Sequence, residues 1–328
     1  MIISKSHFRI SFCGGGTDFK QYFEQSYGNV ISTTIDKAIF VTVHKNFEGH
    51  LFLRYKKKEM VNHVDELEHD MVKAILKMFG IETGIEIAII SEIPSHGSGL
   101  GSSSALASAL IQAISLYQGK VIYRKELAEK TCKLEIDIMK KPIGFQDQYA
   151  ICYGGINKIH FDKSTIAVNS INNHFYNDMV RHLDNISMLF YLGNGRKSEH
   201  ILESHVDNIE SKRLVLNRQR DLVAKMISCI NTKQYNDKVG ALVSESWEYK
   251  KQVTPNATNE NIDNIIRSAL LNGASGAKLC GAGAGGFMLV ICEQNKQMML
   301  REAMQELGLQ ELKFNFSNEG TKVIYCDN

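Results

Sequence analysis

The feature that most constrains this chain is a glycine- and serine-rich segment, IPSHGSGLGSSSA, at residues 93–105. It follows a short apolar run of strand length and leads into residues 102–117, whose alanine and leucine content predicts a helix. Gly97, Gly99 and Gly101 leave main-chain N–H groups open to close approach by a ligand. The N-terminus of the following helix adds unpaired N–H groups and the positive end of a dipole. The segment therefore predicts an anion site, for which phosphate is the usual ligand.

Ser102, Ser103 and Ser104 bring three hydroxyls into the first turn of this helix, where they can cap it, donate to phosphate or ligate Mg²⁺. A plain strand–turn–helix corner with serine caps is the competing interpretation, yet a cap needs fewer glycines and serines than this. The GxxxxGK[ST] loop is absent, because the only Gly-Lys pair, at residues 119–120, is followed by valine. The HRD and DFG signatures of protein kinases are missing too.

A second glycine loop lies near the C-terminus, where residues 278–290 read KLCGAGAGGFMLV. Gly281, Gly283 and Gly286 satisfy GxGxxG, the dinucleotide-binding pattern. That pattern requires a helix after the loop, whereas FMLV is typical of a strand. We therefore expect a tight turn between two strands, packed near something bulky or charged. A plain hairpin turn remains the alternative.

The N-terminal segment 8–18, FRISFCGGGTD, places Arg9 on an alternating, strand-like stretch before three glycines. These glycines would let a small ligand lie against the backbone, and Asp18 could accept hydrogen bonds from sugar or alcohol hydroxyls. The alternative is structural, since Thr17 or Asp18 could cap a helix that begins at Phe19.

Two further acidic residues are candidates for chemistry. Asp147 lies among apolar and amide side chains in PIGFQDQYAICYGG, residues 142–155, and a neighbouring cation would keep it ionised. Glu135 lies 12 residues earlier, in a segment predicted to be helical. It could be a Mg²⁺ ligand facing the serine loop, but taken alone a glutamate in a helix is expected at the surface.

Strand-like and helix-like segments alternate along the chain, which predicts an α/β or α+β protein. The predicted strands are 39–43, 51–55, 85–90, 156–161, 187–192, 287–291 and 322–325, and the predicted helices are 102–117, 125–139, 205–230, 262–271 and 298–307. Residues 162–185 are polar and without clear periodicity, so a domain boundary is expected near 165–180.

Composition excludes several classes of protein. With 38 Lys and Arg against 36 Asp and Glu, the net charge of +2 gives no basic field for nucleic acid. No apolar run reaches the roughly 18 residues of a membrane span, and residues 1–9 lack the apolar core of a signal peptide. The seven cysteines are scattered without a CxxC pair, which favours a reducing cytoplasm over a zinc or disulfide framework. The length of 328 residues suggests two domains.

Taken together, these segments resemble the GHMP small-molecule kinases, which include galactokinases, homoserine kinases and mevalonate kinases. The resemblance covers most of the chain in the correct order: an Arg-x-x-x-x-Gly cluster, PSHGSGLGSSSA, GFQDQ and KLCGAGAGG. The subgroup of D-glycero-D-manno-heptose 7-phosphate kinases is similar in RxSFxGGGTD, GxQDQ and YGG. Galactokinases have Gly-Glu-His-Thr-Asp where residues 14–18 read GGGTD, so the resemblance argues against galactose and, through Asp18, for another sugar.

The resemblance implies an α+β fold with an N-terminal domain like ribosomal protein S5 domain 2 (1–170) and a ferredoxin-like C-terminal domain (171–328), with ATP and sugar between them. It implies Asp147 as the catalytic aspartate, Arg9 as the cation beside it, and Ser103 with Glu135 as Mg²⁺ ligands. The residues implied to wrap the phosphates of ATP are Gly97, Ser98, Gly99, Leu100, Gly101, Ser102, Ser103 and Ser104, and those implied to support this loop are Gly281, Gly283 and Gly285. Those expected to bind the sugar are Gly15, Gly16, Thr17, Asp18 and Arg196.

The implied reaction uses ATP and Mg²⁺ to phosphorylate the anomeric C1 hydroxyl of D-glycero-D-manno-heptose 7-phosphate, in nucleotide-heptose synthesis for surface polysaccharide. The expected partner is this sugar phosphate, and a homodimer is left open. Arg196, in LGNGRK, is proposed for the 7-phosphate because its guanidinium is forked, although a solvated charge at a turn is equally expected there. The alternatives are another sugar 1-kinase, similar to L-fucokinase or galactokinase, a catalytically silent sensor of sugar and ATP, and a dinucleotide-dependent oxidoreductase.

Overall fold

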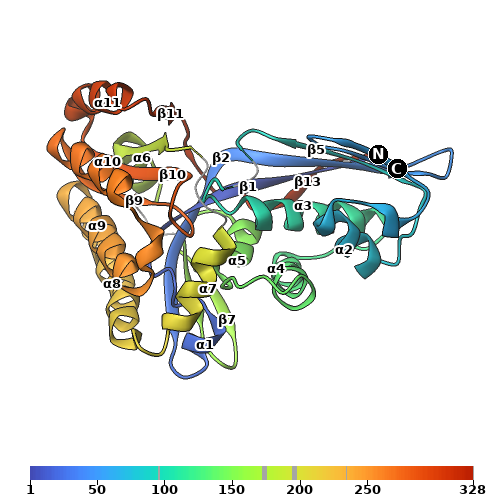
Figure 1. The fold of residues 1–328 in the computed structure, drawn as a ribbon, viewed down its shortest axis with the longest axis horizontal. Helices are drawn as coiled ribbons and strands as arrows, with labels where there is room; N and C mark the ends of the chain where they lie inside the picture. The colour runs from blue at the N-terminus through green and yellow to red at the C-terminus, as the bar shows by residue number, and fades with distance from the viewer. Residues whose placement is uncertain (95–96, 172–175, 194–197, 234, 328) are drawn as a thin grey trace.

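The structure is a computed structural model that describes residues 1–94, 97–171, 176–193, 198–233 and 235–327. Two β-sheets carry the fold, and helices pack against both (Figure 1). Among the described strands every pair is antiparallel except β3 with β5, so the arrangement is α+β.

The first sheet has nine strands and is built on two long ones, which run through its centre. Its main path follows the order β13-β1-β2-β5-β3-β4, with β6 and β12 also paired to β2 and with β7 paired to β6. The strands are β1 (Ile2–Cys13), β2 (Gly28–Lys45), β3 (Leu51–Arg54), β4 (Lys58–Val61), β5 (Ile85–Ser91), β6 (Asn157–Phe161), β7 (Ile166–Ser170), β12 (Phe316–Ser317) and β13 (Lys322–Cys326).

The second sheet has four antiparallel strands in the order β11-β8-β10-β9. They are β8 (Ser187–Tyr191), β9 (Ala274–Leu279), β10 (Phe287–Cys292) and β11 (Gln310–Leu312). All six residues of β10 are buried, because side chains on both faces of this strand pack into apolar clusters. Burial on both faces explains why its sequence is a continuous apolar run instead of an alternating one.

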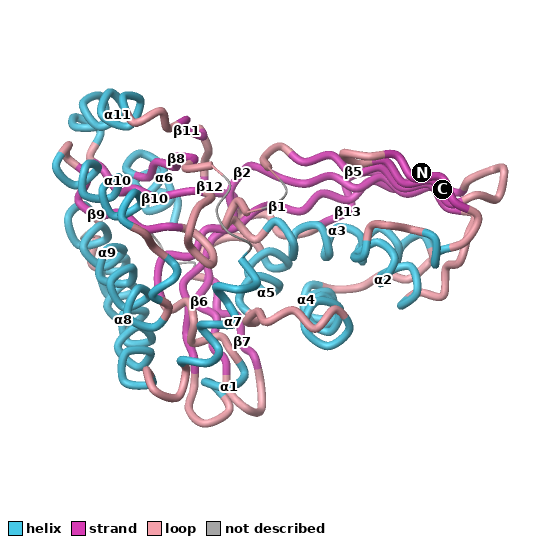
Figure 2. The backbone as a smooth tube through the Cα atoms, in the orientation of Figure 1, coloured by secondary structure: helices cyan, strands magenta, loops and turns pink. Residues whose placement is uncertain are grey.

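The helices divide between the two sheets. Figure 2 shows α2 to α5 along one side of the first sheet and α9 to α11 beside the second. Their bounds are α1 (Lys20–Phe23), α2 (Asp70–Met78), α3 (Ser102–Tyr117), α4 (Arg124–Cys132), α5 (Gln146–Tyr153), α6 (Tyr176–Ile186), α7 (Ser198–Asn208), α8 (Arg213–Asn231), α9 (Asn236–Val253), α10 (Glu260–Leu271) and α11 (Gln297–Glu306). A π-helical segment, Lys133–Ile138, continues α4, and 3-10 turns lie at Val64–Glu66, Pro255–Ala257 and Gln294–Lys296.

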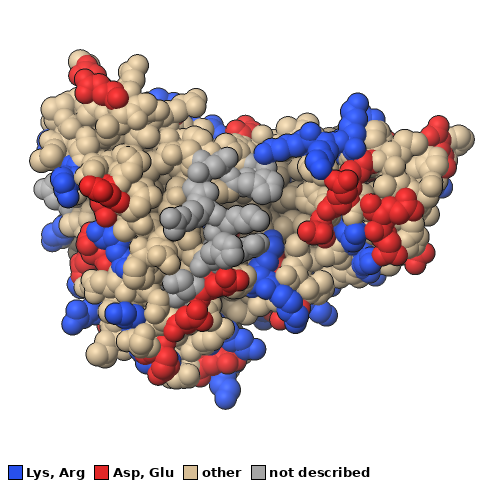
Figure 3. Space-filling view, in the orientation of Figure 1, with Lys and Arg blue, Asp and Glu red and all other residues tan. Residues whose placement is uncertain are grey.

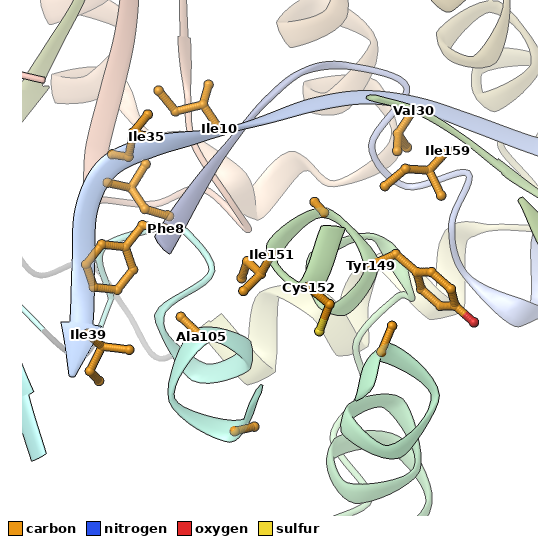
Figure 4. Close-up of a cluster of buried hydrophobic side chains, with 14 of the residues drawn as sticks. Phe8, Ile10, Val30, Ile35, Ile39, Ala105, Tyr149, Ile151, Cys152 and Ile159 are labelled. Carbon is orange, nitrogen blue, oxygen red and sulfur yellow. The ribbon is translucent and has the colours of Figure 1, made fainter. Parts of the chain in front are cut away.

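The main core fills the space between the first sheet and helices α3 and α5 (Figure 4). The core includes Phe8 and Ile10 of β1, Ala105 of α3 and Ile151 of α5, and all four are fully buried. Burying a phenylalanine or isoleucine side chain of this kind contributes about 1.5–3 kcal/mol. This packing fixes β1, the start of α3 and α5 relative to one another, and these three elements carry the candidate site.

The end of the chain returns to the first sheet. Cys326 of β13 pairs with Ile2 of β1, and Phe316 of β12 pairs with Ile35 of β2. The two termini consequently lie side by side in Figure 1. A division of the chain at residue 170 stays a prediction, and these last strands are structurally part of the sheet formed by the N-terminal residues.

The polar stretch 162–185, in which the sequence shows no clear periodicity, contains β7 and α6. Met179, Leu183 and Ile186 of α6 are buried at helical spacing, although their neighbours are polar. The single long helix predicted at 205–230 is wrong, since α7 ends at Asn208 and α8 begins at Arg213. The break contains no glycine or proline; Ile209 is buried in the core there, so tertiary packing ends the helix.

Helix α9, which the sequence analysis did not predict, packs against β9 through two glycines. A Cβ atom added to Gly276 would lie 1.9 Å from the carbonyl oxygen of Gly240. The helix can approach the strand this closely only because neither residue has a side chain.

We predict that Gly276→Ala destabilises the protein. The added methyl group must push α9 away from β9, and overpacking of this kind costs roughly 1–3 kcal/mol. Urea denaturation followed by circular dichroism measures the change in the free energy of unfolding. Unaltered stability would show that α9 and β9 are not in close contact.

Candidate active site

The phosphate loop, by which we mean residues 97–104, has the open backbone that the sequence predicts. Gly97, Gly99 and Gly101 have φ angles of 69°, 75° and 76°, in the left-handed region that only glycine adopts easily. Gly101 is the N-cap of α3, and no side chain at this position bonds the first N–H groups of the helix. The hydroxyls of Ser98 and Ser102 are 2.6 Å apart and brace the turn. The loop thus presents unpaired N–H groups at the positive end of a helix.

The second glycine loop joins β9 to β10 and lies against the phosphate loop. A Cβ atom on Gly281 would lie 2.5 Å from the Cα atom of Gly99, and one on Gly286 would lie 2.4 Å from the carbonyl oxygen of Gly97. The main-chain N–H of Phe287 donates to the carbonyl of Ser98 at 2.9 Å. Side chains at these glycines would therefore push the two loops apart.

Gly283 of this second loop contacts a different segment. It packs against the turn at Ala257, where its Cβ would lie 2.6 Å from the carbonyl oxygen. Gly285 has a φ of 148°, which suits a glycine, and the neighbouring Gly286 touches the phosphate loop. Because the loop connects two antiparallel strands, it also lacks the helix that a dinucleotide-binding fingerprint requires, so the oxidoreductase alternative is wrong.

Arg9 connects the phosphate loop to Asp147. Its Nε and Nη2 atoms donate to the two carboxylate oxygens of Asp147, each at 2.7 Å, and its Nη1 donates to the carbonyl of Gly99 at 2.6 Å. Arg9 is only 3% exposed. Burial opposes its charge, but the Asp147 carboxylate outweighs that effect and raises the pKa of Arg9 above its ordinary value. Asp147 lies in the first turn of α5, where the helix dipole also favours its negative charge.

Glu135 is completely buried, so the surface position expected from the sequence alone is wrong. Its carboxylate accepts hydrogen bonds from the hydroxyls of Ser103 and Ser104 and from the side-chain amide of Gln148. It lies in the π-helical segment Lys133–Ile138, whose wider turn replaces the regular helix predicted here. Wide turns of this type are frequent at functional sites, because they turn a side chain away from the regular helical spacing.

A lysine that the sequence analysis did not consider completes this cluster. The ammonium group of Lys141 donates to the Ser103 hydroxyl at 2.6 Å and to Glu135 at 3.1 Å. A cation thus already lies between the two residues that the resemblance implies for Mg²⁺, and oxygen donors of this type suit that ion. No group of three or more His, Cys, Asp or Glu residues suited to a metal occurs in the described part of the chain. The site fits an ion that also takes ligands from phosphate and water, as Mg²⁺ does.

A cavity adjoins Asp147 on the side away from α3. Gly15, Gly16 and Asp18 line it together with Arg9 and Asp147, and helices α7, α8 and α9 close its far side. Three of the residues predicted to bind sugar are therefore at a cavity next to the predicted catalytic pair.

Asp18 has a structural role as well as a place in the cavity wall. Its carboxylate accepts hydrogen bonds from the main-chain N–H of Gly16 at 2.9 Å and of Gln146 at 3.0 Å, so it caps the start of α5. The alternative in which Thr17 or Asp18 caps a helix that begins at Phe19 is wrong, because α1 begins at Lys20 and has no side-chain cap hydrogen bond. Burial raises the pKa of Asp18 despite these two hydrogen bonds.

Thr17, which was predicted to bind sugar, is not among the residues that line this cavity. Thr17 is fully buried, and its hydroxyl bonds the carbonyls of Gly14 and Asn29. This position corrects the prediction, because the hydroxyl holds the loop together and does not reach the cavity. Arg196 lies outside the described residues.

Two lysines of the cavity wall were missed. Lys278 on β9 is 5% exposed, and its ammonium donates to the carbonyls of Ser11 and Phe12. Lys250 on α9 donates to the carbonyl of Gly281. Burial, reinforced by the nearby charges of Lys278 and Arg9, lowers the pKa of Lys250 to about 7.

A pattern in the sequence could have revealed Lys250. Val239, Val243 and Trp247 recur every four residues, and all are buried. Lys250 comes three residues after Trp247, which places it on the same face of the helix and therefore toward the interior.

Basic and acidic side chains are interspersed over the face shown in Figure 3. Within the described ranges, none of the helices combines the length and the apolar character that crossing a bilayer demands.

Two family models match the chain. One, described as the GHMP kinases N terminal domain, matches residues 62–155, and the other, described as GHMP kinases C terminal, matches residues 232–308. The first range contains the phosphate loop, Glu135 and Asp147, and the second contains the β9–β10 loop.

Comparison with known proteins gives relatives over the whole chain. The D-glycero-alpha-D-manno-heptose 7-phosphate kinase of Campylobacter jejuni is 26% identical over 336 residues, which cover 98% of each chain. The L-fucokinase/L-fucose-1-P guanylyltransferase of Bacteroides fragilis is 26% identical over 89% of this chain and 35% of that protein. A crystal structure described as a D-glycero-D-manno-heptose 1-phosphate kinase from Bacteriodes thetaiotaomicron covers all of both chains, with a TM-score of 0.80 and 18% identity. This structural likeness shows a shared fold.

We predict that Lys141→Met destabilises the protein, because Glu135 would stay buried without its cation. Removing one partner of a buried ion pair costs roughly 3 kcal/mol. Lys140→Met is the matched control, since Lys140 is the preceding residue and is exposed. Urea denaturation should show a clear loss for the first variant and a change below about 0.5 kcal/mol for the second. Equal stability of the two variants would contradict the ion pair.

Proposed function

Because this chain belongs to the GHMP kinases and has their α+β fold, we propose that it transfers the γ-phosphoryl group of ATP to the anomeric C1 hydroxyl of D-glycero-D-manno-heptose 7-phosphate. The product is the 1,7-bisphosphate. The name of the Campylobacter jejuni relative, which is similar over nearly the whole chain, supports this acceptor. The name of the Bacteriodes thetaiotaomicron structure supports a heptose as the sugar but gives a 1-phosphate kinase.

The observation that carries this proposal is the bond pattern of Arg9. One guanidinium holds both oxygens of Asp147 and the carbonyl of Gly99 in the phosphate loop. A carboxylate is thereby held between the phosphate loop and a cavity whose lining includes several polar and charged side chains. Phosphoryl transfer asks a protein mainly to align the acceptor hydroxyl with the phosphorus and to stabilise charge, and this arrangement meets both needs.

In the proposed reaction, the C1 oxygen of the sugar forms a bond to the γ-phosphorus as the bond from that phosphorus to the β–γ bridging oxygen breaks. ADP leaves with the electron pair, and the hydroxyl proton passes to Asp147 and then to solvent. Asp147 accepts the proton late, as the loose transition state collapses.

Different groups of the protein would bind the nucleotide and the metal. The N–H groups of residues 97–104 would hold the phosphates of ATP, and Ser103 with Glu135 would hold Mg²⁺. When bound, Mg²⁺ supplies charge neutralisation on the phosphate oxygens. Lys141 must yield or share its position between Ser103 and Glu135 when the metal binds.

The Bacteroides fragilis relative favours a second candidate acceptor. Its printed name includes L-fucokinase, and its similarity to this chain covers 89% of the residues. An unphosphorylated 6-deoxy sugar would need no cation at the far end of the cavity, so the two candidates make different demands on this site. The product of the first candidate would feed nucleotide-heptose synthesis for surface polysaccharide.

We predict that Asp147→Asn lowers kcat by roughly 10²–10⁴-fold, because the amide cannot take up the hydroxyl proton. Binding of a non-hydrolysable ATP analogue, measured by calorimetry, should stay within about twofold, since Asp147 faces the acceptor cavity. Asp70→Asn, an exposed substitution on α2, is the control and should retain full turnover. Near-normal kcat for Asp147→Asn would remove Asp147 from the chemistry.

We predict ATP consumption with D-glycero-D-manno-heptose 7-phosphate and little with the same heptose lacking the phosphate. Coupled measurement of ADP and NMR of the product determine the rate and the position of the new phosphate. Preference for L-fucose would favour the second candidate. ADP release with none of the sugars would favour a silent sensor.

A further inference from the structure

Lys250 is a cation for which the structure gives no carboxylate partner. Among the described residues, its ammonium makes a hydrogen bond to the main-chain carbonyl of Gly281 and no ion pair. Its neighbour Lys251 behaves as a surface lysine and pairs with Glu248 at 2.8 Å. A lysine that lines a cavity without an acidic partner costs stability, so an anionic ligand is the simplest reason for its position.

The charges of the cavity wall leave room for such an anion. The described lining residues include three cations, Arg9, Lys250 and Lys278, and two carboxylates, Asp18 and Asp147. Three minus two leaves one excess positive charge when both lysines are protonated. A phosphate monoester is an anion that would offset this excess.

A second observation in the same cavity also indicates a ligand. Gln219 on α8 is 3% exposed and lines the cavity. Its amide nitrogen donates to Ser246 and to the carbonyl of Gly15, whereas its side-chain oxygen has no hydrogen-bond partner within the described ranges. A buried oxygen of this kind normally accepts a hydrogen bond, and a sugar hydroxyl would supply one.

We propose that the ammonium group of Lys250 binds the phosphate group that the acceptor sugar already carries. The inference rests on the proposed function, in which the acceptor is a phosphorylated sugar. Lys250 is thus a specificity-determining residue, which separates phosphorylated from unphosphorylated acceptors. It takes the role that the sequence analysis gave to Arg196.

The cavity wall favours the acceptor over the nucleotide as the source of this phosphate. Within the described ranges, no residue of the phosphate loop lines the cavity that contains Lys250. The lining residues come from α9, from β9, from the β9–β10 loop at Gly281 and Ala282, and from the loop at Gly15 and Gly16, where sugar is expected.

The binding should depend on pH in a defined direction. Burial and the charges of Lys278 and Arg9 lower the pKa of Lys250 to about 7. Cys280 and Asp18 act on it in the opposite direction. Lys250 is therefore charged below about pH 7 and loses its charge above it. Binding of a phosphorylated sugar should weaken as the pH rises from 7 to 9.

Calorimetry on the full-length protein without turnover tests this inference. The ligands are D-glycero-D-manno-heptose 7-phosphate, the same heptose without phosphate, and a non-hydrolysable ATP analogue. Lys250→Met should weaken binding of the phosphorylated heptose by roughly 10-fold to 100-fold, as expected for loss of a charge-assisted hydrogen bond. Binding of the other two ligands should stay unchanged.

Two variants serve as references. Lys250→Arg keeps the charge at every pH used, so its binding should stay constant between pH 7 and 9. Lys251→Met removes the adjacent lysine and should bind all three ligands like the wild type. Weaker binding of the ATP analogue by Lys250→Met would assign Lys250 to the transferred phosphate and overturn the inference, as would unchanged binding of the phosphorylated heptose.

Inorganic phosphate separates failure of this inference from failure of the proposed function. It is titrated in the presence of saturating ATP analogue, which occupies the phosphate loop. If no phosphorylated heptose binds but inorganic phosphate binds in a Lys250-dependent manner, the proposed acceptor is wrong and the anion site stands. If Lys250→Met phosphorylates the heptose 7-phosphate with an unchanged KM, the function stands and the inference fails. Phosphate binding that is absent, or equal in the wild type and Lys250→Met, would also overturn it.

Discussion

The candidate site depends on one buried guanidinium. Arg9 is almost completely enclosed, and such a charge is tolerated only when carboxylates and carbonyls satisfy its N–H groups. Here Asp147 and the carbonyl of Gly99 do so, and the main-chain N–H of Arg9 also donates to the carbonyl of Leu100. A shift of β1, of α5 or of the phosphate loop would break one of these bonds and leave charge unpaired. The cost of unpaired charge therefore keeps the three parts in one arrangement.

The other cations around Arg9 differ in how completely the protein itself satisfies them. Lys141 is paired with Glu135, and Lys278 is surrounded by main-chain carbonyls, so both contribute to the structure without a ligand. Lys250 has a single carbonyl among the described residues, and burial together with the charges of Lys278 and Arg9 lowers its pKa to about 7. Charges that the fold satisfies hold the site together, and the charge that it leaves unsatisfied is available to a ligand.

The sequence predicted those parts of the site that are formed by residues adjacent in the chain. The glycines of the phosphate loop and the alanine-rich helix after it are recognisable from composition, and the structure has both at the predicted residues. Glu135 shows the limit, because its burial depends on a π-helical turn and on Gln148, which no helical pattern reveals. Thr17 shows the opposite error, since a threonine beside three glycines resembles a ligand contact until Asn29 is brought next to it. Lys250 was missed because helix α9 was not predicted, although Val239, Val243 and Trp247 recur before it at helical spacing.

A crystal structure with a non-hydrolysable ATP analogue and heptose 7-phosphate would test the central claim most directly, since it locates both reacting groups at once. We expect the terminal phosphorus to lie between residues 97–104 and Asp147, with the C1 hydroxyl of the sugar within hydrogen-bond distance of that carboxylate. A phosphate tail bound elsewhere, or an Asp147 carboxylate pointing away from the terminal phosphorus, would contradict the assignment of this site to phosphoryl transfer.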